Sequence, residues 1–110
     1  MNEPTQWHQD REAEWETVFV TLRAEGWTVN HTGLAAPLQL EGRLPSGEAF
    51  YFRSRHDEVS LAIGGEDPSD SPAWEGRETY GTDSDASYLP GGDGLAILRR
   101  LVGGYRQVES

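Results

Sequence analysis

Apolar side chains recur with helical spacing near the start of the chain. The stripe consists of Trp15, Val18, Phe19 and Leu22. These positions follow the i, i+3, i+4, i+7 spacing that places side chains on one face of an α-helix. Gly26 follows the last of them, and glycine readily adopts the left-handed backbone that ends a helix. The pattern therefore predicts a helix over residues 8–25.

Three later runs alternate between apolar and polar residues, which is the pattern of β-strands with one buried face. They span 38–44, 50–55 and 59–63, and their apolar members are Leu38, Leu40, Leu44, Phe50, Phe52, Val59, Leu61 and Ile63. A shorter run at 27–31 predicts a preceding strand with Trp27 and Val29 on the apolar side. Thr32–Gly33 is typical of the connection that would follow it.

The loop lengths between these runs decide the strand register. A three-residue loop at Pro45–Gly47 places Leu40 opposite Phe52, and its Pro-Ser-Gly sequence suits a turn that closes with a left-handed glycine. A four-residue loop at Arg55–Glu58 places Phe52 opposite Leu61. A one-residue slip in either hairpin would turn one strand's apolar side chains to water. We therefore expect one apolar row to cross three antiparallel strands.

The alternation stops at residue 64. Segment 64–94 contains eight of the 19 acidic residues, a single Arg and a single member of the Leu, Ile, Val and Phe group. A connection of this length is far longer than most in compact domains, so the segment is functional, disordered or contains a short strand. Weak strand candidates lie at 77–80 and 86–89.

Helical spacing returns near the end of the chain. The apolar positions are Leu95, Leu98, Leu101, Val102 and Tyr105. They predict a second helix that Asp93 caps and that Gly103–Gly104 ends or frays. We therefore predict one α+β domain over 1–110, with an N-terminal helix and a meander of three to five antiparallel strands. A long acidic loop at 64–94 follows, and the C-terminal helix packs on the same sheet face as the first, giving two layers.

Composition narrows the classes of function. The chain has 110 residues, no Cys and a formal net charge of -10. The lack of Cys excludes disulfides, thiolate nucleophiles and zinc ribbons. The negative charge argues against nucleic-acid binding, which depends on Lys and Arg. No run is long and apolar enough to span a bilayer, and the first residues lack the features of a secretory leader, so we expect a cytoplasmic protein without a membrane partner.

The acidic segment is the leading candidate for a binding surface. Its expected partner-binding residues are Trp74, Glu75, Glu78, Tyr80, Asp83, Asp85 and Tyr88. Aromatic side chains are frequent interface anchors, and clustered charge steers a partner of opposite sign. The sequence thus predicts a non-catalytic module of the inhibitor, immunity or regulatory type that binds a basic protein, as a monomer or weak dimer. Trp74 itself is either a plug that holds the segment onto the core or an exposed anchor.

Two motifs in this segment fail when their spacing is tested. Residues 83–88 resemble the start of an EF-hand loop, but Tyr88 stands where glycine is required and Gly94 where the bidentate Glu is required. The glycine-rich run 91–94 resembles a phosphate-binding loop, but it lacks the third glycine and the Gly-Lys-Ser/Thr signature. No catalytic residue, metal site or cofactor is therefore predicted.

Two other hypotheses stay open. A small enzyme or ligand binder could place a carboxylate and a His, for example His31, between the sheet and the acidic loop, with the loop acting as a lid. The acidity could instead serve solubility alone. A further candidate surface is the polar face of the sheet, for which solvation with cross-strand pairs is the default interpretation. Its residues are Gln39, Glu41, Arg43, Tyr51, Arg53 and Arg55.

Overall fold

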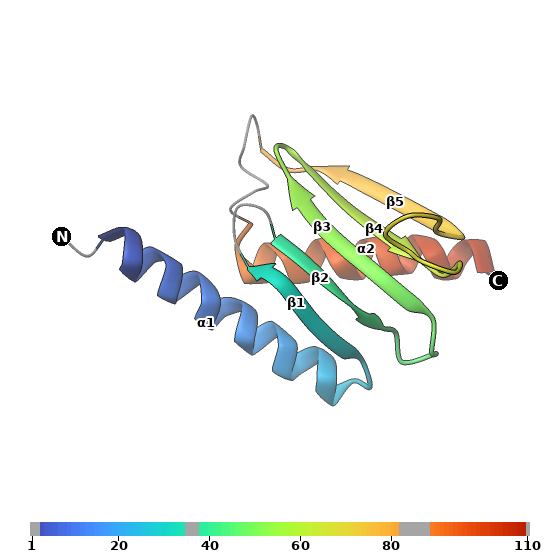
Figure 1. Cartoon of the computed structure of the whole chain (residues 1–110), viewed down its shortest axis with the longest axis horizontal. Coiled ribbons are helices and arrows are strands. Elements are labelled where there is room, and N and C mark those ends of the chain that lie inside the picture. Colours follow the sequence, from blue (N-terminus) through green and yellow to red (C-terminus); the bar gives the residue numbers. More distant parts are fainter. Residues whose placement is uncertain (1–2, 35–37, 82–88, 110) are drawn as a thin grey trace.

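The structure, a computed structural model, describes residues 3–34, 38–81 and 89–109, and the side chains within 10–30, 38–81 and 89–108. Seven elements follow one another along the chain (Figure 1). They are α1 (Glu3–Ala24), β1 (Thr28–Leu34), β2 (Leu38–Arg43), β3 (Ala49–Arg55), β4 (Glu58–Ile63), β5 (Trp74–Thr79) and α2 (Gly91–Glu109). This order confirms the predicted helix, antiparallel meander and C-terminal helix. Neither of the two described helices is long and apolar enough to cross a membrane.

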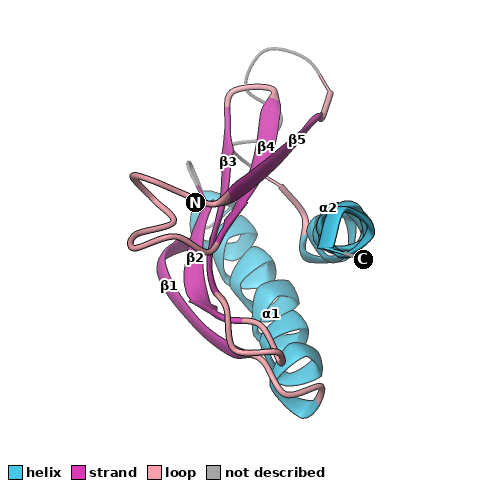
Figure 2. Cartoon of the chain, turned by 90° about the vertical axis from the view of Figure 1, so that its right-hand side faces the viewer, coloured by secondary structure: helices cyan, strands magenta, loops and turns pink. Residues whose placement is uncertain are grey.

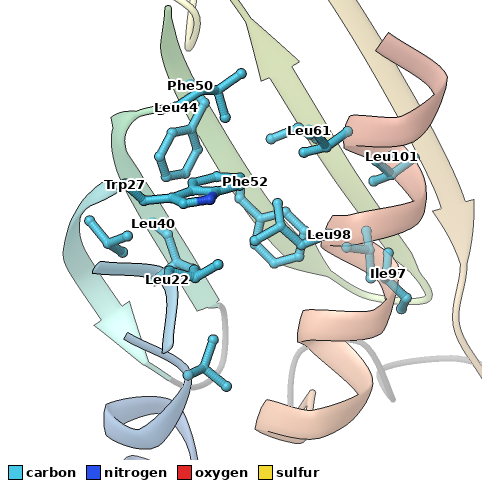
Figure 3. Close-up of a cluster of buried hydrophobic side chains, with 14 of the residues drawn as sticks. Leu22, Trp27, Leu40, Leu44, Phe50, Phe52, Leu61, Ile97, Leu98 and Leu101 are labelled. Atoms are coloured by element: carbon cyan, nitrogen blue, oxygen red, sulfur yellow. The ribbon is translucent and has the colours of Figure 1, made fainter. Parts of the chain in front are cut away.

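The elements form two layers. The five strands lie side by side in chain order, and every neighbouring pair is antiparallel. Both helices lie on one face of this sheet, as the sequence predicts, and no helix of the described residues lies on the other face (Figure 2). One hydrophobic core joins the inner sheet face to both helices. Figure 3 shows Phe52 and Leu61 of the sheet and Leu98 of α2 directed into this core.

The predicted strand register is confirmed. Leu40 is opposite Phe52, and Phe52 is opposite Leu61. All three side chains are fully buried, so the expected apolar row exists. The first hairpin closes through the predicted turn, because the Leu44 N–H donates to the carbonyl of Glu48 at 2.9 Å and Gly47 has a φ of 104°.

Several element ends differ from the predictions. The second hairpin turns on two residues rather than four, because Arg55 still pairs with Glu58 and His56 takes the left-handed conformation. The register of its apolar pairs is unaffected, since both loop lengths give the same parity. The first helix begins earlier than predicted, at Glu3, and the first strand continues to Leu34 through a register shift.

The predicted acidic loop 64–94 contains a fifth strand and the first turn of α2. Strand β5 is hard to recognise in the sequence because its inner face consists of Trp74, Gly76 and Glu78, of which one is apolar. A Cβ atom at Gly76 would collide with the Trp74 ring, so the missing side chain makes room for the indole. The second weak strand candidate, 86–89, lies almost wholly outside the described residues.

The two helices meet at a close crossing around Trp15. Its indole is fully buried, and its Nε1–H donates to the carbonyl of Leu89 at 3.0 Å. A Cβ atom at Gly94 would overlap the same ring. The Glu14 carboxylate accepts a hydrogen bond from the Gly91 N–H at 2.9 Å, so a residue of α1 satisfies a free donor at the start of α2. The glycine-rich run therefore serves as the contact surface for α1.

The start and end of α2 correct two expectations. Asp93 lies within the first turn rather than before it, and its carboxylate accepts a hydrogen bond from the Tyr80 hydroxyl. Gly103–Gly104 neither ends nor interrupts the helix, which continues to Glu109. Packing of the apolar side of α2 against β4 and β5 outweighs the low helix propensity of the two glycines.

Two glycine-to-alanine substitutions in α2 should have opposite effects. Gly94→Ala should destabilise the protein by about 1–3 kcal/mol, because the new methyl group overlaps Trp15 in a closely packed crossing. Gly103→Ala should stabilise it by about 0.5–1 kcal/mol, because that glycine is helical and its Cβ position is open. Urea unfolding of both variants checks this prediction, and equal effects at the two sites would contradict it.

Candidate functional site

The residues expected to bind a partner do not lie on one surface. Strand β5 alternates, so Trp74 and Glu78 face α2 while Glu75 faces outward. Tyr80 follows the strand and also lies against α2, through its bond to Asp93. The remaining three expected residues lie outside the described part of the chain. They are Asp83, Asp85 and Tyr88.

Trp74 packs between β5 and α2. Its ring lies against Gly76, and its centroid is 5.5 Å from that of Tyr105 in α2. The side chain is half-buried and packs against the hydrophobic core. Of the two roles considered for Trp74, this arrangement matches a plug that holds the segment onto the core.

Glu78 and Tyr80 are also engaged with α2. The Arg100 guanidinium donates to both carboxylate oxygens of Glu78, at 2.8 and 2.9 Å. The Tyr80 hydroxyl donates to Asp93 at 2.6 Å. The bidentate contact with Arg100 lowers the pKa of Glu78 below its ordinary value of 4.5, against the effect of partial burial. These side chains therefore attach β5 to α2.

The outer face of the sheet carries a groove. The β4–β5 connection, residues 64–73, folds over this face on the side opposite the helices (Figure 2). On one side of the connection lies a hollow of about 560 Å³, here called the outer groove. Its lining comes from three strands, the β3–β4 turn and the connection. The residues are Tyr51, Arg53, Arg55, His56, Asp57, Glu58, Ser60, Ala62, Pro68, Ser69, Asp70, Pro72, Glu75 and Arg77.

A second hollow lies on the other side of the connection. Its volume is about 310 Å³, and its floor is formed by the outward residues of β1, β2 and β3, including Asn30, Arg43 and Tyr51. Pro68 and Ser69 line both hollows, so the connection forms the wall between them. The outer face thus carries two open hollows, one on each side of the connection.

Asp67 holds the connection in shape. Its carboxylate accepts hydrogen bonds from the N–H and the hydroxyl of Ser69, at 3.1 and 2.7 Å. Its carbonyl accepts from the N–H groups of Asp70 and Ser71. This local turn keeps the side chains of Glu66 and Asp70 exposed. Neither of these two carboxylates forms an ion pair with a described residue.

Charges of both signs meet on the floor of the outer groove. Arg77 lies 3.1 Å from Glu75 and 3.8 Å from Glu58. The hydrogen bond to Glu75 and the two negative charges raise the pKa of Arg77 above its ordinary value. Arg53 and Arg55 have no ion pair among the described residues. The exposed acids of the connection and the arginines of the floor therefore form separate regions of opposite charge on this face.

The groove contains one histidine, at its end. His56 occupies the exposed tip of the β3–β4 turn beside Asp57. The side chains of His8 and His31 lie outside the described set, so the catalytic role considered for His31 stays a prediction. Within residues 3–34, 38–81 and 89–109, no cluster of three or more His, Asp and Glu side chains could hold a metal ion.

Comparisons with known proteins assign no family to this arrangement. The chain matches no protein-family model, no curated protein and no solved structure. The sequence predicts the polar sheet face as a candidate surface, but it does not predict the groove on that face. The groove forms because residues 64–73 fold over the outer sheet face. No local sequence pattern indicates this, because the fold-over depends on contacts with strands far away in the sequence.

The Glu78–Arg100 contact makes a pH-dependent contribution to stability. Because folding lowers the pKa of Glu78, the unfolded chain takes up a proton there more readily than the folded one near pH 4. The stabilisation is therefore present above the ordinary pKa and is lost as the pH falls through the lowered value. Glu78→Gln should reduce the midpoint of thermal unfolding at pH 7, and this deficit should shrink progressively as the pH falls below the ordinary pKa of a glutamate and through the lowered pKa of Glu78.

Circular dichroism melts of wild type and variant over this pH range measure the effect. Glu41→Gln is the matched control, because Glu41 is exposed on the outer face and has no ion pair among the described residues. A deficit of Glu78→Gln that persists unchanged in acid would contradict the prediction.

Proposed function

We propose that the protein is a non-catalytic interaction module that binds a basic protein partner, in the manner of an inhibitor, immunity or regulatory protein. The contact surface combines the acidic connection 64–73 with the outer groove beside it. A cytoplasmic location is part of the same proposal. The observation that carries it is the placement of Glu66 and Asp70, two exposed carboxylates without an ion pair among the described residues, on the connection beside a groove that Asp70 lines, on the sheet face that no described helix covers.

The geometry of the connection supports this role. Glu66 and Asp70 project from a turn that Asp67 and Ser69 hold in place, so little ordering of the backbone is needed when a partner binds. Fixed charges of one sign at the rim attract a partner of opposite sign and accelerate its association. The net charge of -10 acts in the same direction at longer range.

The floor of the groove supplies contacts of another kind. Tyr51 combines apolar area with a hydroxyl group, a combination that is frequent at protein interfaces. Arg53 and Arg55 can donate to carbonyl or carboxylate oxygens of the partner, because no described acid engages them. Basic side chains of the partner would thus bind the rim while its backbone or an acidic residue binds the floor.

The alternative of a small enzyme or ligand binder would use the same groove, because its lining combines residues of the sheet with residues of the connection. His56 and Asp70 would then be the first residues to examine, since both line the groove. Titration of His56 by NMR, with and without Asp70→Asn, would reveal a coupled acid–base pair. We favour the binding role because the groove is open and His56 lies at its exposed end.

Paired substitutions test the proposed binding surface. Glu66→Gln/Asp70→Asn removes two charges from the connection, and Glu12→Gln/Glu16→Gln removes two exposed charges from α1. Asp67 is left intact because it holds the turn. Affinity capture from the native source at low and high salt, followed by association kinetics on the recovered partner, should show a several-fold slower on-rate for the first variant. The α1 variant should bind like wild type.

The outcomes separate the proposal from its rivals. Equal slowing by both variants would mean that net charge alone attracts the partner and that the connection is not the contact surface. A partner whose association is insensitive to salt and to both variants would overturn the proposal. A third variant, Asp83→Asn/Asp85→Asn, measures the contribution of the two acids that the sequence also predicted to bind.

A further inference from the structure

Among the described residues, strand β5 lies at an edge of the sheet. It pairs with β4 on one side and is the last strand of the sheet on the other. The opposite edge, β1, has a register shift between His31 and Gly33, and such irregularities disturb strand pairing. The pairing of β5 with β4 is regular over all six residues, from Trp74 to Thr79. Of the two edges, β5 is therefore the better template for another strand.

The hydrogen-bonding groups at this edge can be assigned. The Tyr80 N–H donates to the carbonyl of Asp57 at 2.7 Å, so the backbone of Tyr80 points toward β4. The backbone N–H and C=O groups of successive residues alternate in direction along an antiparallel strand. Those of Glu75, Arg77 and Thr79 therefore point away from β4, within the plane of the sheet and toward its edge. They are available to a neighbouring strand.

The charged side chains on β5 are complementary to those of a second, antiparallel copy of the same strand. Glu75 and Arg77 both face outward, on either side of Gly76. When two β5 strands run antiparallel about a two-fold axis through Gly76, Glu75 of each copy lies opposite Arg77 of the other. Opposite charges in directly facing positions stabilise strand pairs. About four backbone hydrogen bonds would accompany these two charge pairs.

Neighbouring registers lack this match. An axis through Arg77 places Arg77 opposite itself, and an axis through Glu75 places Glu75 opposite itself, and like charges in facing positions are destabilising. A two-fold axis that passes between two successive residues of β5 would place inner-face residues of one copy opposite outer-face residues of the other. The charge pattern therefore selects the register centred on Gly76.

The inner face adds apolar contact at the same axis. The Trp74 ring lies over Gly76 of its own chain and is only half-buried. At a two-fold axis through Gly76, the two copies of this glycine are neighbours, so the two Trp74 rings lie beside each other. Pairing would cover the exposed part of each indole, which supplies a hydrophobic contribution in addition to the backbone bonds.

We propose that two copies of this chain associate through β5, in an antiparallel pair centred on Gly76, to form one continuous ten-stranded sheet. The argument for this association does not rest on the proposed binding of a basic partner, although Glu75 and Arg77 also line the outer groove. It leaves the exposed acids of the 64–73 connection outside the pairing edge.

Charge exchange tests the proposal. Sedimentation velocity and light scattering on the full chain should show a reversible dimer. Glu75→Arg and Arg77→Glu should each raise its dissociation constant by about 10-fold or more, because each replaces two attractive pairs by two repulsive ones. An equimolar mixture of the two variants should associate like wild type, because each copy then faces charges of opposite sign.

The mixing step distinguishes contacts between chains from contacts within one chain. Either single substitution also removes the internal Glu75–Arg77 ion pair, but mixing restores only pairs between chains. Arg53→Glu is the control, since Arg53 lies on the same face two strands away and should leave association unchanged. Circular dichroism verifies that each variant is folded.

Three results would overturn the proposal. The first is a wild-type chain that stays monomeric at concentrations up to about 1 mM. The second is a dimer whose dissociation constant neither single substitution changes. The third is a mixture that associates no better than the separate variants, which would exclude the register centred on Gly76.

Discussion

The close crossing of α1 and α2 holds the two-layer architecture together. Both helices must lie on the same sheet face to cover one core, and they can do so only if they pass near each other. The buried Trp15 ring occupies this crossing, where Gly94 has no side chain to obstruct it. The Gly91 N–H donates a hydrogen bond to the Glu14 carboxylate, and the Trp15 Nε1–H donates one to the Leu89 carbonyl; these two bonds fix α2 relative to α1. The position of the sheet beneath them depends on this contact.

The placement of the helices decides which surface can bind. Because both lie on the inner face, the β4–β5 connection is the segment of the described chain that covers part of the polar outer face of the sheet. Trp74, Glu78 and Tyr80 are used on the inner side to attach β5 to α2. Acidic residues that are adjacent in sequence thus have different roles: those facing inward stabilise the fold, and those on the connection are presented to solvent.

The sequence is sufficient to predict the features that follow from the spacing of apolar residues and from whether a hairpin loop has an odd or even number of residues. The rows through Leu40, Phe52 and Leu61 follow from alternation and loop length, since any slip would expose apolar side chains. Strand β5 could be predicted only weakly, because Gly76 and Glu78 occupy inner positions that usually carry apolar residues. The role of Gly94 and the groove beside residues 64–73 depend on contacts between segments far apart in the sequence, which leave no local sequence pattern.

The contact between Trp15 and Leu89 joins residues separated by 74 positions along the chain. By contrast, each strand of the meander pairs with its immediate successor, so its contacts close short loops at a low entropic cost. Folding of the chain is therefore expected to begin with hairpins of neighbouring strands, and the contact between α1 and α2 around Trp15 forms last. Until the two helices dock, the apolar face of the sheet is exposed to water. The rate of helix docking therefore sets how long newly synthesised chains can aggregate through this face.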